Sequence, residues 1–235
     1  MKYQKYLSKL DNQQKKYAKI PQVNHKVDAV KETVIALSNK QIPVQELPQL
    51  SFTQEELFEH PELFEVEDLL LDLRQVVIEN FGVWHIFSTR WLADLRDFLG
   101  NTKTLELMAG NAIISANLNN TYATDNFLWQ GQDIEVPSPW TNVERLDAMQ
   151  AIQKYYLQVQ NIIMAWAPDN NQNDWEVLSW LRKVNWQGNF ILIGEKNGAT
   201  NSELFWEKVK LEEPIKLNKH HKEFDFIKDK VYFVK

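Results

Sequence analysis

The sequence contains no cysteine, and this absence excludes both disulfide bonds and thiolate zinc sites. Only five histidines are scattered along the chain, which weighs against a metal centre of any other kind. No apolar run reaches about eighteen residues, so we expect no membrane span. Residues 1–10 carry lysines but lack the apolar centre and the small-residue cleavage site of a secretory signal. Together these absences predict a cytoplasmic protein.

Charge is unevenly distributed along the chain, although the net charge is only −6. Residues 1–40 hold nine lysines and three acidic residues, whereas residues 41–80 hold one arginine and ten acidic residues. The basic segment could contact phosphate or an acidic partner. A solvated lysine-rich helix that folds back on the acidic segment is the simpler interpretation. Because a general nucleic-acid binder is usually basic overall, we do not expect nucleic acid as a partner.

The first eighty residues are dominated by helical periodicity. Residues Tyr3–Asn39 are polar with apolar positions three or four apart, and Val66–Phe81 has the pattern of one long amphipathic helix. Between them, Thr53 and Glu56 have the spacing of a capping box, which predicts a short helix. We therefore interpret residues 1–80 as a helical N-terminal extension.

Residues 81–235 have a different sequence pattern, in which short apolar runs alternate with stretches of helical periodicity. Strands are expected at Thr104–Leu107, Tyr122–Thr124, Asn161–Trp166, Phe190–Ile193 and Val231–Val234. Helices are expected at Thr89–Phe98, Ile113–Leu118, Ala148–Tyr156, Trp175–Lys183 and Ser202–Val209. This alternation predicts an α/β domain with a mostly parallel sheet wrapped by helices.

Two segments have the character of a nucleotide site. Leu105–Ser115 runs from a strand through a tight turn into a helix, which is where doubly wound sheets bind nucleotides. Glu106 offers a carboxylate under this turn. Asp125 ends the next expected strand, roughly twenty residues further on, where an acid can accept hydrogen bonds from both ribose hydroxyls. On its own, an aspartate at this position is more often a helix cap or a turn residue, but the spacing of Asp125 from Glu106 favours the ribose role.

These segments resemble those of class I S-adenosylmethionine (SAM) dependent methyltransferases, in particular a poorly characterised methyltransferase-like group. The first motif of the family reads roughly Glu-x-Gly-x-Gly-x-Gly, and Glu106 and Gly110 match two of its anchors. Met108 and Ala112 stand where the family has glycine. The resemblance covers about residues 105–235 and implies a Rossmann-like doubly wound sheet that binds SAM in residues 81–235.

The resemblance also implies a set of site residues. The cofactor-binding residues that it implies are Glu106, Met108, Ala109, Gly110, Asn111, Asp125, Asn126, Phe127, Asp147, Ala148 and Trp166. Asp147 would meet the adenine amino group, but it equally suits an acid at the start of the following helix. Trp166 would line the mouth of the site at the end of a strand, and a purely structural tryptophan is the alternative.

Two further residues are candidates for catalysis. Phe190–Ser202 resembles the fifth strand and the following turn of that group, so that Glu195 would project from a strand end towards the pocket. His85 lies in residues 82–89, a segment that would close over SAM, and it is the leading candidate for a general base. We therefore predict His85 and Glu195 as catalytic residues and no metal ligands.

Three functions are compatible with these features. The first is a SAM-dependent methyltransferase acting on a small-molecule or protein acceptor. Nucleic-acid amino groups are disfavoured as acceptors, because the Asp/Asn-Pro-Pro-aromatic motif of the enzymes that methylate them is missing after Asn161–Trp166. The second is a catalytically inactive, methyltransferase-like regulatory or scaffolding protein, suggested by Met108 and Ala112. The third, an oxidoreductase using a dinucleotide, is disfavoured because the turn lacks Gly-x-Gly-x-x-Gly.

Overall fold

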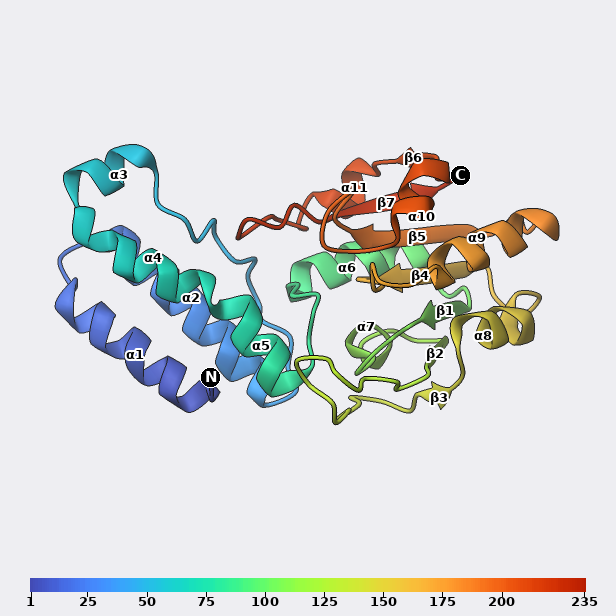
Figure 1. The fold of residues 1–235 in the computed structure, drawn as a ribbon, viewed down its shortest axis with the longest axis horizontal. Coiled ribbons are helices and arrows are strands. Elements are labelled where there is room, and N and C mark those ends of the chain that lie inside the picture. The colour runs from blue at the N-terminus through green and yellow to red at the C-terminus, as the bar shows by residue number, and fades with distance from the viewer.

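Helices and strands occupy different parts of the molecule. In the computed structural model, which describes residues 1–235, the first helices lie at one side and a seven-stranded sheet at the other (Figure 1). The elements of the first part are α1 (Tyr3–Lys16), α2 (Pro21–Ser38), α3 (Gln54–Glu59), the 3-10 turn η1 (Pro61–Leu63), α4 (Phe64–Leu71) and α5 (Leu73–Phe81). None of the helices has the length and apolar composition that a membrane span requires.

The boundaries of these helices differ from the predicted ones in two places. The helical region expected over Tyr3–Asn39 is two helices, because Pro21 lacks an N–H and occupies the first turn of α2. The helix expected over Val66–Phe81 is divided at Asp72 into α4 and α5. The capping box is confirmed: Thr53 Oγ1 accepts the Glu56 N–H at 3.2 Å, and Glu56 Oε2 accepts the Thr53 N–H at 2.7 Å.

The basic start of the chain does fold back on the acidic segment. Helix α1 packs against α2 and α5. Lys16 Nζ lies 3.6 Å from a Glu65 carboxylate oxygen, and the amino group of Met1 pairs with Glu79. The Lys16–Glu65 pair is exposed, so it contributes little to stability. The packing of α1 comes instead from buried side chains such as Tyr6 and Leu10.

The sheet has the strand order β3-β2-β1-β4-β5-β7-β6. Its strands are β1 (Thr104–Leu107), β2 (Thr121–Asp125), β3 (Glu144–Arg145), β4 (Asn161–Ala165), β5 (Asn189–Gly194), β6 (Leu211–Glu212) and β7 (Lys230–Val234). The five strands expected from the sequence are confirmed, and β3 and β6 are additional. Strands β3, β2, β1, β4 and β5 are parallel, whereas β7 is antiparallel to both β5 and β6.

Helices cover both faces of the sheet. The remaining helices are α6 (Thr89–Leu99), α7 (Ile113–Ala116), α8 (Ala148–Tyr155), α9 (Asn173–Lys183), α10 (Glu203–Lys208) and α11 (Ile215–Asn218). Because side chains alternate along a strand, Ile163 and Ile191 join a core with α6, α7 and α11, whereas Ile162 and Leu192 join a core with α8, α9 and α10. The first of these cores continues into α1–α5. The chain is thus an α/β protein with a mixed, mostly parallel sheet.

This topology determines where a ligand would meet the sheet. The loops that follow β1, β2, β4 and β5 leave the sheet at one edge, and β7 begins at that same edge because it is antiparallel. The strand order reverses between β1 and β4. In open α/β sheets, ligands bind outside the carboxyl ends of the strands at such a switch point. The residues along this edge are therefore the candidates for a functional site.

Candidate functional site

The turn after β1 has an unusual backbone. Met108, Gly110 and Ala112 have φ angles of 51°, 55° and 53°. This left-handed conformation suits glycine and strains other residues. The turn thus has the backbone form of a glycine-rich loop, although only one of its three left-handed positions carries glycine.

Two carboxylates support this turn from within the protein. Asp125, at the end of β2, accepts the Gly110 N–H at 2.8 Å and the Phe127 N–H at 2.7 Å. Burial raises the pKa of Asp125, and these two N–H bonds oppose the rise. Glu106 accepts the Ser115 N–H at 2.9 Å and also the Ser115 hydroxyl. Burial raises the pKa of Glu106 to about 7, with the nearby Asp125 adding to the rise.

Aromatic rings cover the outer side of the turn. Trp84 and Trp129 pack edge to face with ring centroids 5.3 Å apart. A Cβ built on Gly110 would lie 3.6 Å from the ring of Trp84 and 3.7 Å from that of Trp129. Phe127 packs against Trp129 in turn, with centroids 5.8 Å apart. These rings rest on the backbone that the sequence analysis expected to face a cofactor.

Other predicted cofactor residues have partners within the protein. Asn111 donates from Nδ2 to the Phe81 carbonyl at 2.8 Å and accepts the Ser138 N–H at 2.8 Å. Asn126 accepts the Leu128 N–H at 2.9 Å. Asp147 caps α8 by accepting the Gln150 N–H at 2.7 Å. Asp147 therefore occupies the helix-start position that was its alternative interpretation, and its contact with adenine stays a prediction.

The remaining members of the predicted set are Ala109, Ala148 and Trp166. Ala109 donates its N–H to the Thr124 carbonyl at 2.9 Å, which joins the turn to β2. Ala148 is buried in the core under α8. Trp166 follows β4 and has a left-handed φ of 54°. The structure thus brings the turn, the end of β2 and the end of β4 to one edge, while Asp147 and Ala148 start the helix after β3.

A buried ion pair lies beside Trp166. Arg74 of α5 binds both carboxylate oxygens of Asp225, from Nε at 2.6 Å and from Nη2 at 3.1 Å. It also donates to the Trp84 carbonyl at 3.0 Å. The guanidinium carbon lies 4.5 Å from the ring centroids of both Trp166 and Phe224. Arg74 thereby connects the first helices of the chain to the edge of the sheet.

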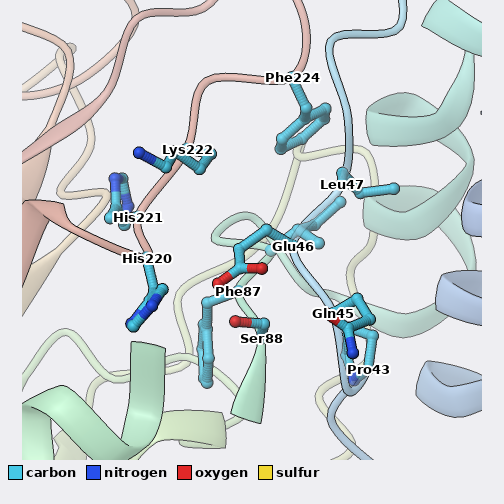
Figure 2. Close-up of a pocket in the computed structure, with 11 residues that line it drawn as sticks. Pro43, Gln45, Glu46, Leu47, Phe87, Ser88, His220, His221, Lys222 and Phe224 are labelled. Carbon is cyan, nitrogen blue, oxygen red and sulfur yellow. The ribbon is translucent and has the colours of Figure 1, made fainter. Parts of the chain in front are cut away.

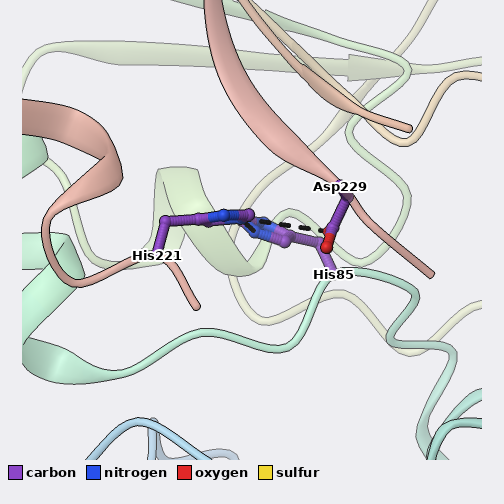
Figure 3. Close-up of side chains that lie close together, drawn as sticks. All are labelled: His85, His221 and Asp229. Carbon is purple, nitrogen blue, oxygen red and sulfur yellow. Dashed lines mark hydrogen bonds and ion pairs between the residues drawn. The ribbon is translucent and has the colours of Figure 1, made fainter. Parts of the chain in front are cut away.

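The predicted base, His85, meets a second histidine. Its Nε2 lies 2.9 Å from His221 Nε2, which in turn lies 3.9 Å from an Asp229 carboxylate oxygen (Figure 3). That oxygen also accepts the Trp166 indole N–H at 2.8 Å. Burial lowers the pKa of both imidazoles, and the nearby charge of Arg74 adds to the effect. Asp229 opposes this lowering of the pKa at His221.

The sequence analysis missed His221 and Asp229. They lie in residues 219–229, between α11 and β7, a segment without a recognisable motif. The only local signal was the pair His220–His221, and the two side chains diverge. His220 pairs with Asp94 at 2.7 Å, whereas His221 turns to His85.

Glu195, the second predicted catalytic residue, is engaged by backbone amides. Its Oε2 accepts the Ala199 N–H at 2.8 Å and its Oε1 accepts the Lys228 N–H at 2.8 Å. It thereby holds the turn after β5 against the segment that leads to β7. This arrangement gives Glu195 a structural partner for each oxygen, and its catalytic role stays a prediction.

A small pocket adjoins the histidine cluster. It lies between the segment Pro43–Leu47, the segment Ile86–Ser88 and residues His220–Phe224 (Figure 2). Its enclosed space is about 20 Å³, which is room for roughly one water molecule. The pocket can therefore supply a water beside His221, but it cannot hold a cofactor.

Comparisons with known proteins add no family to this picture. The sequence matches no protein-family profile, and no curated protein is significantly similar to it. The functional argument consequently rests on the residues and the geometry of this chain.

Proposed function

We propose that this chain is a SAM-dependent methyltransferase that acts on a small-molecule or protein acceptor. In this proposal residues 81–235 form a Rossmann-like, doubly wound SAM-binding domain, and residues 1–80 are its helical N-terminal extension. One observation carries the proposal. Met108, Gly110 and Ala112, the positions where the family motif has glycine, all have left-handed φ angles between 51° and 55°.

The sheet order supports this proposal over a dinucleotide-dependent oxidoreductase. Dinucleotide-binding sheets have the order 3-2-1-4-5-6. This sheet shares the first five positions but places the antiparallel β7 between β5 and β6. The absence of Gly-x-Gly-x-x-Gly from the turn after β1 agrees with this choice.

Asp125 is the residue that we assign to the ribose of SAM. An ionised carboxylate has about four acceptor positions, and the Gly110 and Phe127 amides use two of them. The Trp129 side chain also donates to this carboxylate, so this side chain would have to release it before two ribose hydroxyl groups could bind without breaking the contact between β2 and the turn. Asp125 would therefore position the cofactor and hold the turn at the same time.

The aromatic rings over the turn would have to move when SAM binds. Trp84 and Trp129 lie over Gly110, so the rings must withdraw for the cofactor to reach the backbone of the turn. Phe127 and Trp129 would then lie against the adenine and exclude water. Bound SAM supplies an electrophilic methyl group, and its transfer requires chiefly an aligned acceptor in a site without water. Trp166, at the end of β4, would lie beside such an acceptor.

Thermal unfolding with SAM and S-adenosylhomocysteine tests the assignment. A hundredfold excess of ligand over its Kd stabilises the native state by about 2.7 kcal/mol, which for a chain of this size is a shift in Tm of roughly 5–10 °C. In this proposal Asp125→Ala removes two charged hydrogen bonds to the ribose, each of about 1.5–3 kcal/mol, and should weaken binding by at least about 100-fold.

Glu195→Ala is the matched control. Glu195 also accepts two backbone N–H bonds at the same edge of the sheet, so its loss should disturb a turn to a similar extent. The proposal predicts that this variant keeps the shift in Tm caused by SAM. An equal loss of the shift in both variants, or no shift in the wild-type protein at millimolar SAM, would contradict the assignment of Asp125.

A second candidate function is a methyltransferase-like protein without catalysis, in a regulatory or scaffolding role. Met108 in the left-handed turn and the rings over Gly110 favour it. Met108→Gly distinguishes the two functions, because glycine removes both the side chain and the backbone strain. SAM binding that appears only in Met108→Gly or Trp129→Ala would favour the inactive protein. Tight binding by the wild-type chain would favour the enzyme.

A further inference from the structure

We propose that His85, His221 and Asp229 form a binding site for a divalent transition-metal ion such as Zn²⁺. The Nε2 atoms of the two imidazoles and a carboxylate oxygen of Asp229 all lie within 4.8 Å of one another (Figure 3). The three residues come from the segment between α5 and α6 and from both ends of the segment between α11 and β7. The site does not depend on SAM binding.

The distance between the two imidazole nitrogens suits coordination to one ion. Zinc–nitrogen bonds are about 2.0–2.1 Å long, so two imidazole nitrogens on one ion lie about 2.9–3.4 Å apart for bond angles of roughly 90–109°. The two Nε2 atoms are 2.9 Å apart. The Asp229 oxygen is 3.9 Å from His221 Nε2, about half an ångström beyond the upper value of that range. The Asp229 carboxylate would have to move towards the two imidazoles to complete the site.

The charge of Asp229 provides a second argument for a bound cation, independent of the distances. Its carboxylate is buried, at 4% exposure, and His221 is its only partner within ion-pair distance. The nearby Arg74 cannot balance it, because both oxygens of Asp225 already bind that guanidinium. A buried charge without a counter-charge is costly. A divalent cation held by both imidazoles would supply the missing positive charge.

The surroundings determine which ion fits and how it is held. Two imidazoles and one carboxylate are the donor set of zinc, iron, cobalt and nickel, whereas magnesium and calcium prefer oxygen ligands. The Trp166 indole N–H bonds the ligating oxygen of Asp229 at 2.8 Å and fixes its orientation. Three protein ligands leave at least one coordination position open.

The ring nitrogens that face away from the cluster would need partners from outside the protein. His85 Nδ1 and His221 Nδ1 are both buried and have no hydrogen-bond partner within the protein. Metal-ligating histidines commonly donate this second N–H to a carbonyl, a carboxylate or a water. A water in the adjoining pocket would provide such a partner for His221.

Metal titration of the full chain tests the proposal. The protein is stripped with a chelator, and Zn²⁺ or Co²⁺ is added alone, with Co²⁺ monitored by its visible absorption and Zn²⁺ by elemental analysis after dialysis. The site predicts one ion per chain and a rise in Tm of roughly 5–10 °C at a hundredfold excess over the Kd. His221→Ala should weaken binding at least about 100-fold, because loss of even an outer-shell partner costs 10–100-fold.

His220→Ala is the matched control, because this neighbouring histidine pairs with Asp94 and lies outside the cluster. The proposal predicts unchanged metal binding in this variant. Asp229→Asn, which keeps an acceptor for Trp166, provides a second ligand variant if His221→Ala does not fold. Less than one ion per wild-type chain, or an equal loss in His220→Ala and His221→Ala, would overturn the site. Metal uptake lost in both ligand variants and kept in His220→Ala would support it.

Discussion

Asp225→Asn should be among the most destabilising single substitutions in this chain. Arg74 and Asp225 are 6% and 3% exposed, and two hydrogen bonds of 2.6 and 3.1 Å join them. Asparagine can still accept the Ile227 N–H, which binds Asp225 Oδ1 at 3.0 Å. The substitution therefore removes chiefly the charge and leaves the guanidinium buried without a counter-ion. Breaking a buried pair in this way costs about 3–5 kcal/mol, out of a usual total of about 5–15 kcal/mol.

Urea unfolding followed by circular dichroism measures this loss. Glu213→Gln is the control, because Glu213 pairs with Lys230 at 3.3 Å on the surface and should cost less than about 1 kcal/mol. Adding Arg74→Met to Asp225→Asn removes the guanidinium charge that Asp225→Asn leaves buried without a partner. The double variant should therefore be more stable than Asp225→Asn alone. A loss below about 1 kcal/mol in Asp225→Asn would refute the view that this pair holds α5 to the edge of the sheet.

Two further substitutions test the turns at this edge. Burial raises the pKa of Glu106 to about 7 in the native state. Between about pH 4.5 and 7 the native state therefore keeps a proton that the unfolded chain has released. Glu106 should consequently lower the free energy of unfolding by about 3 kcal/mol as the pH rises from about 4.5 to 7. Glu106→Gln should lose this dependence of stability on pH, which urea midpoints at pH 5 and pH 8 measure. Parallel pH profiles for the wild-type protein and Glu106→Gln would contradict the raised pKa of Glu106. Gly194→Ala should cost about 1–3 kcal/mol, because its Cβ would lie 2.3 Å from Thr200 Oγ1; a thermal midpoint equal to that of the wild type would show that the turn after β5 adapts.

The sequence predicted the sheet well for a physical reason. Strands β1, β4 and β5 are buried on both faces, β4 and β5 are mostly apolar, and turn residues bound each of the three. Strands β3 and β6 have only two residues each, so they present no periodicity that a pattern could detect. The helix boundaries at Pro21 and Asp72 were missed because helical spacing continues across both of them.

Only those candidate site residues that follow from the order and spacing of strands and helices could be predicted from the sequence. The position of Asp125 after a strand, opposite the glycine turn, followed from the order of elements, and the structure joins it to Gly110 at 2.8 Å. The left-handed backbone at Met108 was not foreseeable, because methionine has no preference for that conformation. His221 and Asp229 meet His85 only through the tertiary path of the chain, across 136 residues between the two histidines.

Calorimetric titration of the wild-type chain with SAM, and separately with NADH, tests the central claim most directly. The claim is that the left-handed turn after β1 and Asp125 at the end of β2 form a SAM site. It predicts saturable binding of one SAM per chain and no binding of NADH at the same concentration. Binding of NADH in preference to SAM, or no heat with either ligand at millimolar concentration, would contradict it.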